Sequence, residues 1–490
     1  MLMNLRVFLL SFIVFAAVAV KAVNPTGTIP IVYINTQGSV PIVDKVTKIP
    51  ATMRITVPEG YTTLNGRTAE NLSGISLTIR GRGNASWRMD KKPYKLKFEE
   101  KTAVLGMPKS KHFALIPYAV NLISYGCVAG MELARCTGQS WAPYSEPVEV
   151  MLNNEYIGRY FMVESVKIDK NRLNIAEQPD LNEDDSILDG GWLVEIDNTT
   201  DEAQIVIPET DDMNLRVTYH TPEEVSPKQK QWLIDRFTEM NAAIYSGDAS
   251  GEAWAKYIDP ASVARYFIVR EVLGDTDGFN GSFYLHKDLG EGSKWVFGPM
   301  WDLSLDTKYD WIFNDHPSYS QVHWIEPMFY TDIFFENLVE QWGNIKGRMQ
   351  QVYDYIDRLG ELTRYADIAN NERWPQYESA NSIERADHSK RVISNNMDWI
   401  DDEIAYMAGM GAAVRDDNAP VISFVGDKCR VGLVSGEVRV DIFRPDGNAV
   451  ARMVRKGGDV IDTSAFGKGV FIVRASMGAA RGTTLKVVNM

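Results

Sequence analysis

The chain has 490 residues, of which 45% are hydrophobic and 24% charged, values close to the globular average. This composition excludes wholesale disorder and a fibrous repeat, and the length suffices for about two to four domains. With 51 Lys+Arg against 65 Asp+Glu, the net charge of −14 excludes a general nucleic-acid binder, because no surplus of cations exists to release phosphate counterions. Three cysteines are too few for a disulfide scaffold, so we expect buried thiols, with a Cys127–Cys136 bridge as the alternative.

The first 22 residues have the pattern of a secretory signal peptide. Arg6 supplies a short basic region, residues 7–20 form an apolar run, and Ala22 is a small residue before the expected cleavage site. The run is too short to span a bilayer comfortably, although an uncleaved anchor is the alternative. No later stretch reaches 18 apolar residues, so we expect an exported mature chain without a transmembrane segment.

The first half of the mature chain alternates as short strands between turns that contain glycine and proline. One helix, Leu122–Arg135, interrupts this pattern, and an acidic loop, Glu177–Asp185, precedes the last strand. The expected strands are Ile31–Asn35, Thr52–Val57, Ile75–Ile79, Val148–Leu152, Tyr160–Val166 and Gly190–Ile196.

The second half has apolar residues at helical spacing. The expected helices are Pro227–Tyr245, Ala261–Leu273, Phe334–Leu359, Ile383–Ile393 and Trp399–Met407. Strands followed by helices predict an α+β body.

The composition changes again near residue 415. Residues 418–490 hold 11 Lys+Arg and 6 Asp+Glu, so this tail is basic whereas the remainder is strongly acidic. Its short alternating strands, separated by glycine turns, predict a small separate β-sandwich.

A basic segment that contains glycines follows the third expected strand. It runs Arg80-Gly-Arg-Gly-Asn-Ala-Ser-Trp87, and four lysines lie within residues 91–97. Glycines let a backbone approach an anion closely and arginines attract one, so a polyphosphate ligand is one interpretation. An exposed basic hairpin with ordinary turn glycines is the other, because the spacing matches neither a P-loop nor a dinucleotide fingerprint.

A second segment carries acidic residues in an order typical of a metal site. Asp275, Asp277 and Asn280 lie in a glycine loop after a helix, and two short strands then lead to Asp302. Mg²⁺ takes few carboxylates and several waters, so such a hairpin can hold it. The order also parallels the catalytic loop and metal-binding Asp of protein kinases. Ordinary turn chemistry is the alternative, because Asp and Asn are common turn residues.

Taken together, these segments resemble the CotH kinase family, named for spore coat protein H. The resemblance covers roughly Ile29–Ala408 and includes further blocks in the family's order: Leu105–Pro108, Leu152–Gly158, Val163-Glu164, Gly190–Asp197, Arg265–Phe267, Ser282–Lys287 and Gly298–Asp302. It implies a two-lobed, protein-kinase-like body. It also implies a secreted enzyme that uses ATP and Mg²⁺, or another divalent cation, to phosphorylate hydroxyl side chains of extracytoplasmic proteins.

The resemblance implies roles for six residues. Asp277 is the expected catalytic acid, which orients the acceptor hydroxyl, and Asp302 is the expected metal ligand. Arg82, Lys92 and Lys97 are expected to hold the phosphates. Glu164 is the expected partner of one of these lysines.

Two positions depart from the family pattern. The second acid that often follows the Trp-Asp pair is Ser304 here, and the usual Asp and Arg-Asn are missing from Val120–Gly126. A catalytically decayed surface binding or adhesion protein on the same scaffold is therefore the alternative function.

The tail resembles a type IX secretion C-terminal sorting domain of Bacteroidetes. The matching segments are Val440–Phe443, Asp446-Gly447, Ile461–Ser464, Lys468–Arg474 and Lys486–Val488. The resemblance implies delivery to the cell surface by the secretion machinery, and an appended adhesive sandwich is the alternative. The expected organisation is a signal peptide (1–22), a CotH kinase-like domain (23–410) and a β-sandwich (418–490), with a secreted or surface protein as substrate.

Overall fold

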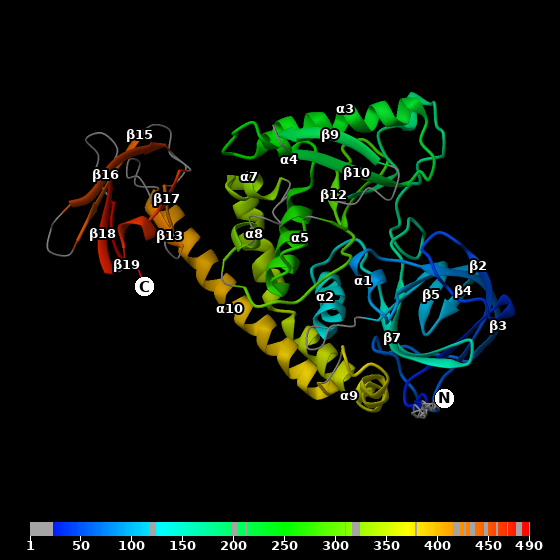
Figure 1. Cartoon of the computed structure of the whole chain (residues 1–490). Coiled ribbons are helices and arrows are strands. Elements are labelled where there is room, and N and C mark those ends of the chain that lie inside the picture. Colours follow the sequence, from blue (N-terminus) through cyan, green and yellow to red (C-terminus); the bar gives the residue numbers. More distant parts are fainter. Residues whose placement is uncertain are drawn as a thin grey trace, which may run out of the picture.

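The computed structural model describes residues 23–117, 124–197, 204–210, 213–279, 281–308, 310–315, 324–377 and 380–414, and in the tail 422–425, 428–431, 437–444, 449–456, 459–467, 469–476 and 483–489. Figure 1 shows a β-barrel beside a larger body of helices and sheet, with two small sheets at the far end of one long helix. The predicted α+β class is confirmed. The expected signal peptide lies outside the described residues.

Seven strands of the N-terminal region close into a barrel in the order β1-β2-β3-β4-β5-β7-β6. Neighbours run antiparallel except for β1 and β6, which pair in parallel with Ile31 opposite Glu149. Alternate side chains point inward and form one core, because successive residues of a strand face opposite sides. The strands are β1 (Ile31–Thr36), β2 (Ile49–Thr56), β3 (Leu72–Gly81), β4 (Tyr94–Val104), β5 (Met107–Ile116), β6 (Ser145–Leu152) and β7 (Glu155–Glu164).

The larger body contains a five-stranded sheet in the order β12-β11-β8-β10-β9. α3 (Pro227–Ile244) packs on β9 and begins with a capping box in which Ser226 and Gln229 satisfy each other's backbone N–H groups. α5 (Pro260–Leu273) is almost entirely buried. The strands are β8 (Trp192–Ile196), β9 (Gln204–Thr210), β10 (Met213–Thr221), β11 (Phe283–Lys287) and β12 (Val296–Phe297).

Two of the predicted helix boundaries are wrong. The helix expected over Phe334–Leu359 is broken at Gly347-Arg348 into α8 and α9, and the two helices expected over residues 383–407 are the single helix α10. The polar Asn396 interrupts the apolar pattern, but its side chain is buried and donates to a backbone carbonyl at 3.0 Å. The remaining helices are α1 (Ala85–Arg88), α2 (Ser124–Cys136), α4 (Glu252–Ala255), α6 (Ile312–Asp315), α7 (Ile325–Phe329), α8 (Asp332–Lys346), α9 (Met349–Arg373) and α10 (Ser382–Val414).

Buried polar contacts attach the barrel to the helical body. The Asp367 carboxylate on α9 accepts hydrogen bonds from Arg159 of β7 and from Arg385 of α10. Lys91, in the connection between β3 and β4, donates to Asn370 at 2.7 Å. All these side chains are buried, so losing one partner would leave a desolvated charge or polar group behind.

The tail forms two sheets, β13-β14-β17 and β16-β15-β18-β19, whose inward side chains share one core. Its described core residues belong to a cluster separate from those of the barrel and the helical body. The strands are β13 (Ile422–Val425), β14 (Lys428–Val431), β15 (Glu437–Phe443), β16 (Ala449–Lys456), β17 (Val460–Asp462), β18 (Gly469–Ser476) and β19 (Thr483–Asn489).

The cysteines and the helices test two further expectations. Cys127, Cys136 and Cys429 are buried free thiols, which confirms the predicted thiols and excludes the alternative bridge. None of the helices in the described residues combines the length and the apolar character that crossing a bilayer requires.

Candidate functional site

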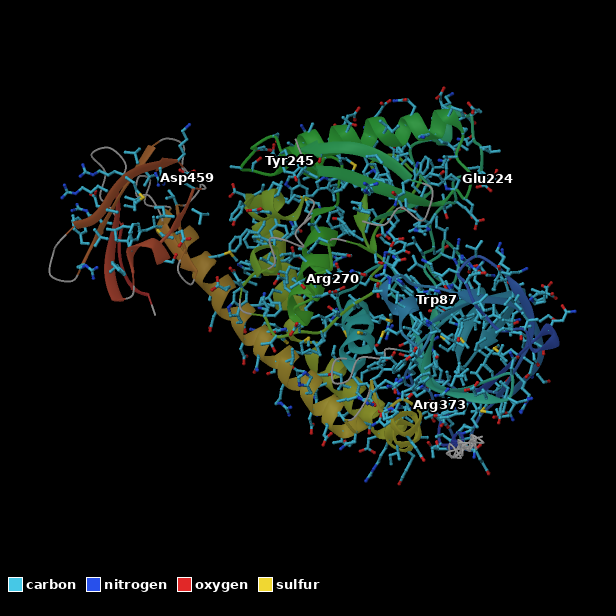
Figure 2. All side chains as sticks on the ribbon, viewed as in Figure 1. Trp87, Glu224, Tyr245, Arg270, Arg373 and Asp459 are labelled. Carbon is cyan, nitrogen blue, oxygen red and sulfur yellow. The ribbon has the colours of Figure 1, made fainter. Side chains whose placement is uncertain are left out.

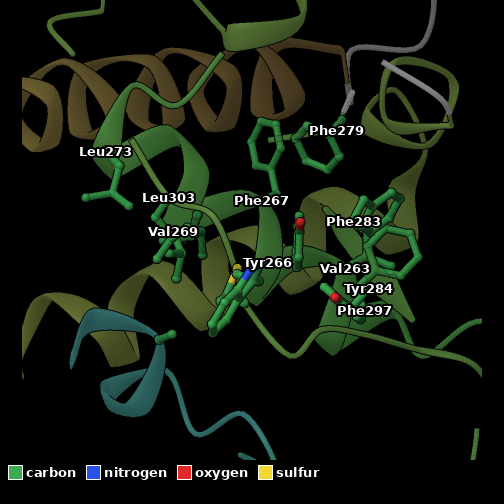
Figure 3. Close-up of a cluster of buried hydrophobic side chains, with 14 of the residues drawn as sticks. Val263, Tyr266, Phe267, Val269, Leu273, Phe279, Phe283, Tyr284, Phe297 and Leu303 are labelled. Atoms are coloured by element: carbon green, nitrogen blue, oxygen red, sulfur yellow. The ribbon is translucent and has the colours of Figure 1, made fainter. Parts of the chain in front are cut away.

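The acidic segment, with Asp275, Asp277 and Asp302, is next to a cluster of buried aromatic side chains. Figure 3 shows the rings of Tyr266, Phe279, Phe283 and Phe297 packed together, with centroid separations of 5.0 Å for Tyr266–Phe283 and 4.7 Å for Phe283–Phe297. α5 ends at Gly274, whose φ is 61° and where a Cβ would come within 2.2 Å of a backbone carbonyl oxygen. Only glycine fits this turn, so the loop leaves α5 in one fixed direction.

Arg270, fully buried on α5, holds the two acidic stretches together. Its guanidinium forms an ion pair with Asp275 in the loop after α5. It also donates to the backbone carbonyls of Trp301 at 2.9 Å and Asp302 at 3.3 Å. Figure 2 places Arg270 in the middle of the helical body. One side chain therefore fixes the loop after α5 relative to the segment after β12.

Ser304 occupies the position where a second acid was expected, and it has a partner. Its hydroxyl donates to Asp275 Oδ1 at 2.7 Å, while Arg270 binds the other carboxylate oxygen. The next acid along the chain is Asp306, which could replace the missing one, but its carboxylate accepts from the N–H of Thr307 at 2.7 Å. Asp275 therefore has a positioning role, and a carboxylate at position 304 would face another carboxylate.

Asp302 has the properties of a ligand for a cation. Its backbone adopts a φ of 51°, and the residue is exposed, although protein groups lie close around its carboxylate. Within the described part of the chain, the Asp302 carboxylate has no hydrogen bond or ion pair. Desolvation by the surrounding protein raises its pKa, and the nearby Asp275 and Asp277 carboxylates add to this effect, whereas Arg82 and Arg270 oppose it. A bound cation would relieve this destabilisation of the charged form.

Asp277 lies on the exposed part of the same loop. Its carboxylate is close enough to Asp302 to raise the pKa of that residue. The structure therefore brings together the two acids that the sequence predicted, while their catalytic and metal-binding roles stay predictions. Asn280 and residues 118–123, which include most of the altered Val120–Gly126 stretch, lie outside the described residues.

Arg82 brings the basic segment to the acidic one. It follows β3, and its backbone N–H donates to the Pro93 carbonyl at 3.2 Å. Its guanidinium lies 5.3 Å from the centroid of the Trp301 ring, a cation–π distance, and its charge acts on Asp302. A cation from the barrel and a carboxylate from the helical body thus meet at one place.

The lysines of the connection between β3 and β4 are partly structural. Lys92 donates to the Trp87 carbonyl at 2.7 Å and lies 5.2 Å from the Trp87 ring centroid. Lys91 is fully buried against Asn370. Two cations of this segment therefore hold it in place, while the alternative of an exposed basic hairpin stays a prediction.

Lys97 and Glu164 have other neighbours. Lys97 is exposed on the outer face of β4, paired in register with His112, and its charge acts on Glu223. Glu164 is fully buried at the end of β7, where desolvation raises its pKa. Its carboxylate lies 3.7 Å from the Arg172 guanidinium, so the expected pairing of Glu164 with a lysine is wrong.

Sequence reasoning missed the Glu195–His220 pair beside the loop. His220 Nε2 lies 2.6 Å from Glu195 Oε2, and the His220 ring stacks on Tyr284 at 5.3 Å. Hydrogen bonds from His220, Tyr284 and Ser282 lower the pKa of Glu195 although desolvation opposes them. The available signal was a charged residue inside an apolar strand, Trp192-Leu-Val-Glu-Ile196, because such a residue is rarely buried without a partner.

Few of the described side chains around Asp302 could serve as metal ligands. Among the residues that the structure describes, no group of three or more His, Cys, Asp or Glu side chains could hold a metal ion. Asp302, with Asp277 nearby, offers the limited carboxylate set that Mg²⁺ uses when phosphates and waters complete its shell. These two carboxylates could therefore supply only part of the ligand shell of a divalent cation.

Comparison with known families gives one match. The chain matches the model of a family described as CotH kinase protein over residues 79–400, about two-thirds of its length. The matched region begins in β3, immediately before the basic segment, and ends in α10, so it includes Arg82, Asp277 and Asp302. No curated protein matches the chain.

Proposed function

This chain belongs to the CotH kinase family, and we propose that it transfers the γ-phosphoryl group of ATP to hydroxyl side chains of secreted or surface proteins. The observation that carries this proposal is the meeting of Arg82 with Trp301 and Asp302. Phosphoryl transfer depends mostly on positioning and on compensation of negative charge. The guanidinium of Arg82 and the carboxylate of Asp302, held close together, can supply both.

Each residue of the site has a role in this proposal. Asp302 holds the divalent cation, which when bound offsets charge on the transferred group. Arg82 binds phosphate oxygens, for which its planar guanidinium is well suited. Asp277 orients the acceptor hydroxyl and accepts its proton. Arg270 and Asp275 are positioning residues, because they contact each other and the backbone.

The remaining predicted residues have contacts with groups other than Asp302. Lys92 supports the Arg82 loop through the Trp87 carbonyl. Lys97, on the outer face of β4, is retained as a second phosphate-binding candidate. Glu164 acts through Arg172, its ion-pair partner.

A two-lobed, kinase-like arrangement is part of the proposal. It is supported by the separate hydrophobic cores of the barrel and of the helical body. In Figure 2, Trp87 lies on the side of the barrel that faces the helical body. ATP would then bind between the two, at the Arg82–Trp301 contact.

Export is proposed on sequence alone. The signal-peptide pattern in residues 1–22 and the sorting-domain resemblance of residues 418–490 support a secreted or surface protein recognised by the secretion machinery.

One observation favours the alternative of a binding protein with a decayed nucleotide site. Ser304 replaces a second acid and is committed to Asp275 through its hydroxyl. In that alternative, the same face recognises a partner protein without ATP turnover.

Autophosphorylation with labelled ATP and Mg²⁺ distinguishes the two functions. Asp277→Asn should lower the rate by roughly 10²–10⁴, because the amide cannot accept the hydroxyl proton. Asp302→Ala should abolish labelling. The matched control is Asp306→Ala, which removes an acid four residues away and should leave labelling unchanged. Equal labelling of all proteins, or none in the wild type, would refute the kinase function.

A further inference from the structure

Three valines project from the loop between β1 and β2. Val40, Val43 and Val46 are 47%, 72% and 80% exposed. Single exposed apolar side chains are ordinary, but three within seven residues concentrate exposed apolar surface on one loop. We refer to residues 40–46 as the valine loop.

The valine loop is held in one conformation by its own contacts. The Val40 carbonyl accepts from the Thr36 hydroxyl at 2.7 Å, and Ile42 packs against the barrel core. The Asp44 carboxylate accepts from the N–H of Val46 at 2.8 Å and of Thr47 at 2.6 Å. A surface that is already ordered loses little conformational freedom when a partner binds.

Further contacts attach the valine loop to the basic segment. The Asp44 carbonyl accepts from the Gly81 N–H at 3.0 Å, and the Arg80 guanidinium donates to the Lys45 carbonyl. A Cβ at Gly81 would lie 2.8 Å from the Asp44 carbonyl oxygen, so glycine permits this close approach. The next residue is Arg82, which lies over Trp301. The valine loop is therefore attached to the two residues that immediately precede Arg82.

The charges around the valines are mainly positive. The Asp44 carboxylate is engaged within the loop. Lys45 and Lys48 lie on this stretch of chain, and the Arg80 guanidinium contacts the Lys45 carbonyl. Such a surface attracts a partner that carries acidic residues beside its apolar ones.

We propose that the valine loop is the docking surface for the acceptor protein. The segment that it binds is extended, with apolar and acidic side chains next to the acceptor hydroxyl. This inference rests on the proposed phosphotransferase function: the attachment of the loop to Arg80 and Gly81, next to Arg82, and the positive charge of Lys45, Lys48 and Arg80 favour an acidic acceptor segment as the occupant over a lipid surface or a second copy.

Peptide binding measured without ATP tests the docking surface separately from catalysis. The probe is a fluorescent synthetic peptide with one serine among valine, leucine and aspartate residues, and the reference peptide has glycine in place of the apolar residues. We expect the first peptide to bind more tightly by fluorescence anisotropy. The double variant Val43→Ser/Val46→Ser should raise its Kd roughly tenfold, the effect of losing partial burial of two valines.

The matched control is Val454→Ser/Val460→Ser, which alters two exposed valines of the tail and should leave the Kd unchanged. Equal Kd values for the wild type and the valine-loop variant would overturn the docking surface, even if the protein phosphorylates the peptide. Parallel loss of ATP affinity in that variant would also overturn it, since the loop would then act by displacing Arg82. Binding of wild-type protein to phosphatidylglycerol vesicles in preference to the peptide would assign the valines to a membrane. Valine-dependent peptide binding without any phosphorylation would retain the docking surface and reject the proposed kinase activity.

Discussion

The Arg82 guanidinium lies 5.3 Å from the centroid of the Trp301 ring, although all the strands from β4 to β12 lie between the two residues in the sequence. Trp301 immediately precedes Asp302, so this contact places a barrel cation beside the acid with the raised pKa. The roles proposed for both residues depend on this one contact.

Substitution of Arg82 should weaken ATP binding. Charge-assisted hydrogen bonds contribute roughly 1.5–3 kcal/mol, so Arg82→Gln should raise the Kd for ATP about tenfold to a hundredfold. Arg88→Gln, an exposed arginine of the same connection, is the matched control and should leave the Kd unchanged. Lys97→Met should have a smaller effect than Arg82→Gln because Lys97 lies beside His112 and Glu223. Calorimetric titration measures all four proteins, and equal effects of Arg82→Gln and Arg88→Gln would contradict the assignment.

Ser304 should respond differently to alanine and to aspartate. Ser304→Ala removes the hydrogen bond to Asp275 and should lower the free energy of unfolding by about 1 kcal/mol. Ser304→Asp places two carboxylates together and should be more destabilising in EDTA, with partial recovery on addition of Mg²⁺. Urea unfolding with and without Mg²⁺ measures both effects. If Mg²⁺ stabilises the two variants equally, the carboxylate at position 304 does not reach the cation.

The pH dependence of stability should reflect Glu146. Burial raises the pKa of this carboxyl to about 8, against the opposing hydrogen bonds from Tyr61 and Leu64. The folded state therefore holds a proton that the unfolded state releases near pH 4.5. The resulting stability is fully present below the unfolded pKa and is lost as the pH rises through about 8.

Glu146→Gln is neutral at every pH and should flatten the decline in unfolding free energy between about pH 5 and about pH 9. Part of the decline should persist, because burial also raises the pKa of Glu271 to about 7. The exposed Glu100→Gln serves as control. Urea unfolding across this pH range measures the effect, and an unaltered decline in Glu146→Gln would show that Glu146 does not cause it.

The tail should be dispensable for the folding of the rest of the chain. Its described core residues form a cluster separate from those of the barrel and the helical body. We therefore expect residues 1–417 to retain the melting temperature of the barrel and helical body and any ATP binding. Calorimetric melting of the full and truncated chains tests this expectation, and a substantially lower melting temperature after truncation would show that the tail packs on the body.

Local patterns predicted the two acids and many of the elements, but not β4, β5, β9 and β10, and long-range packing could not be predicted. α3 and α5 begin within one residue of their expected starts because capping residues and apolar spacing are local signals. Barrel closure depends on pairing Ile31 with Glu149, which no local pattern specifies. Asp277 and Asp302 were predicted from their order in a hairpin, but the contacts of Ser304 and Arg270 with Asp275 required three-dimensional packing.

Calorimetric titration of ATP into the wild type and Asp302→Ala, with and without Mg²⁺, tests the central claim most directly. The account predicts that wild-type binding requires Mg²⁺, because the cation joins Asp302 to the phosphates. Asp302→Ala should lose this Mg²⁺-dependent binding, while Asp277→Asn should retain the wild-type affinity within a few fold. Wild-type protein that binds no ATP in Mg²⁺, or Asp302→Ala that binds it as tightly as the wild type, would contradict the account.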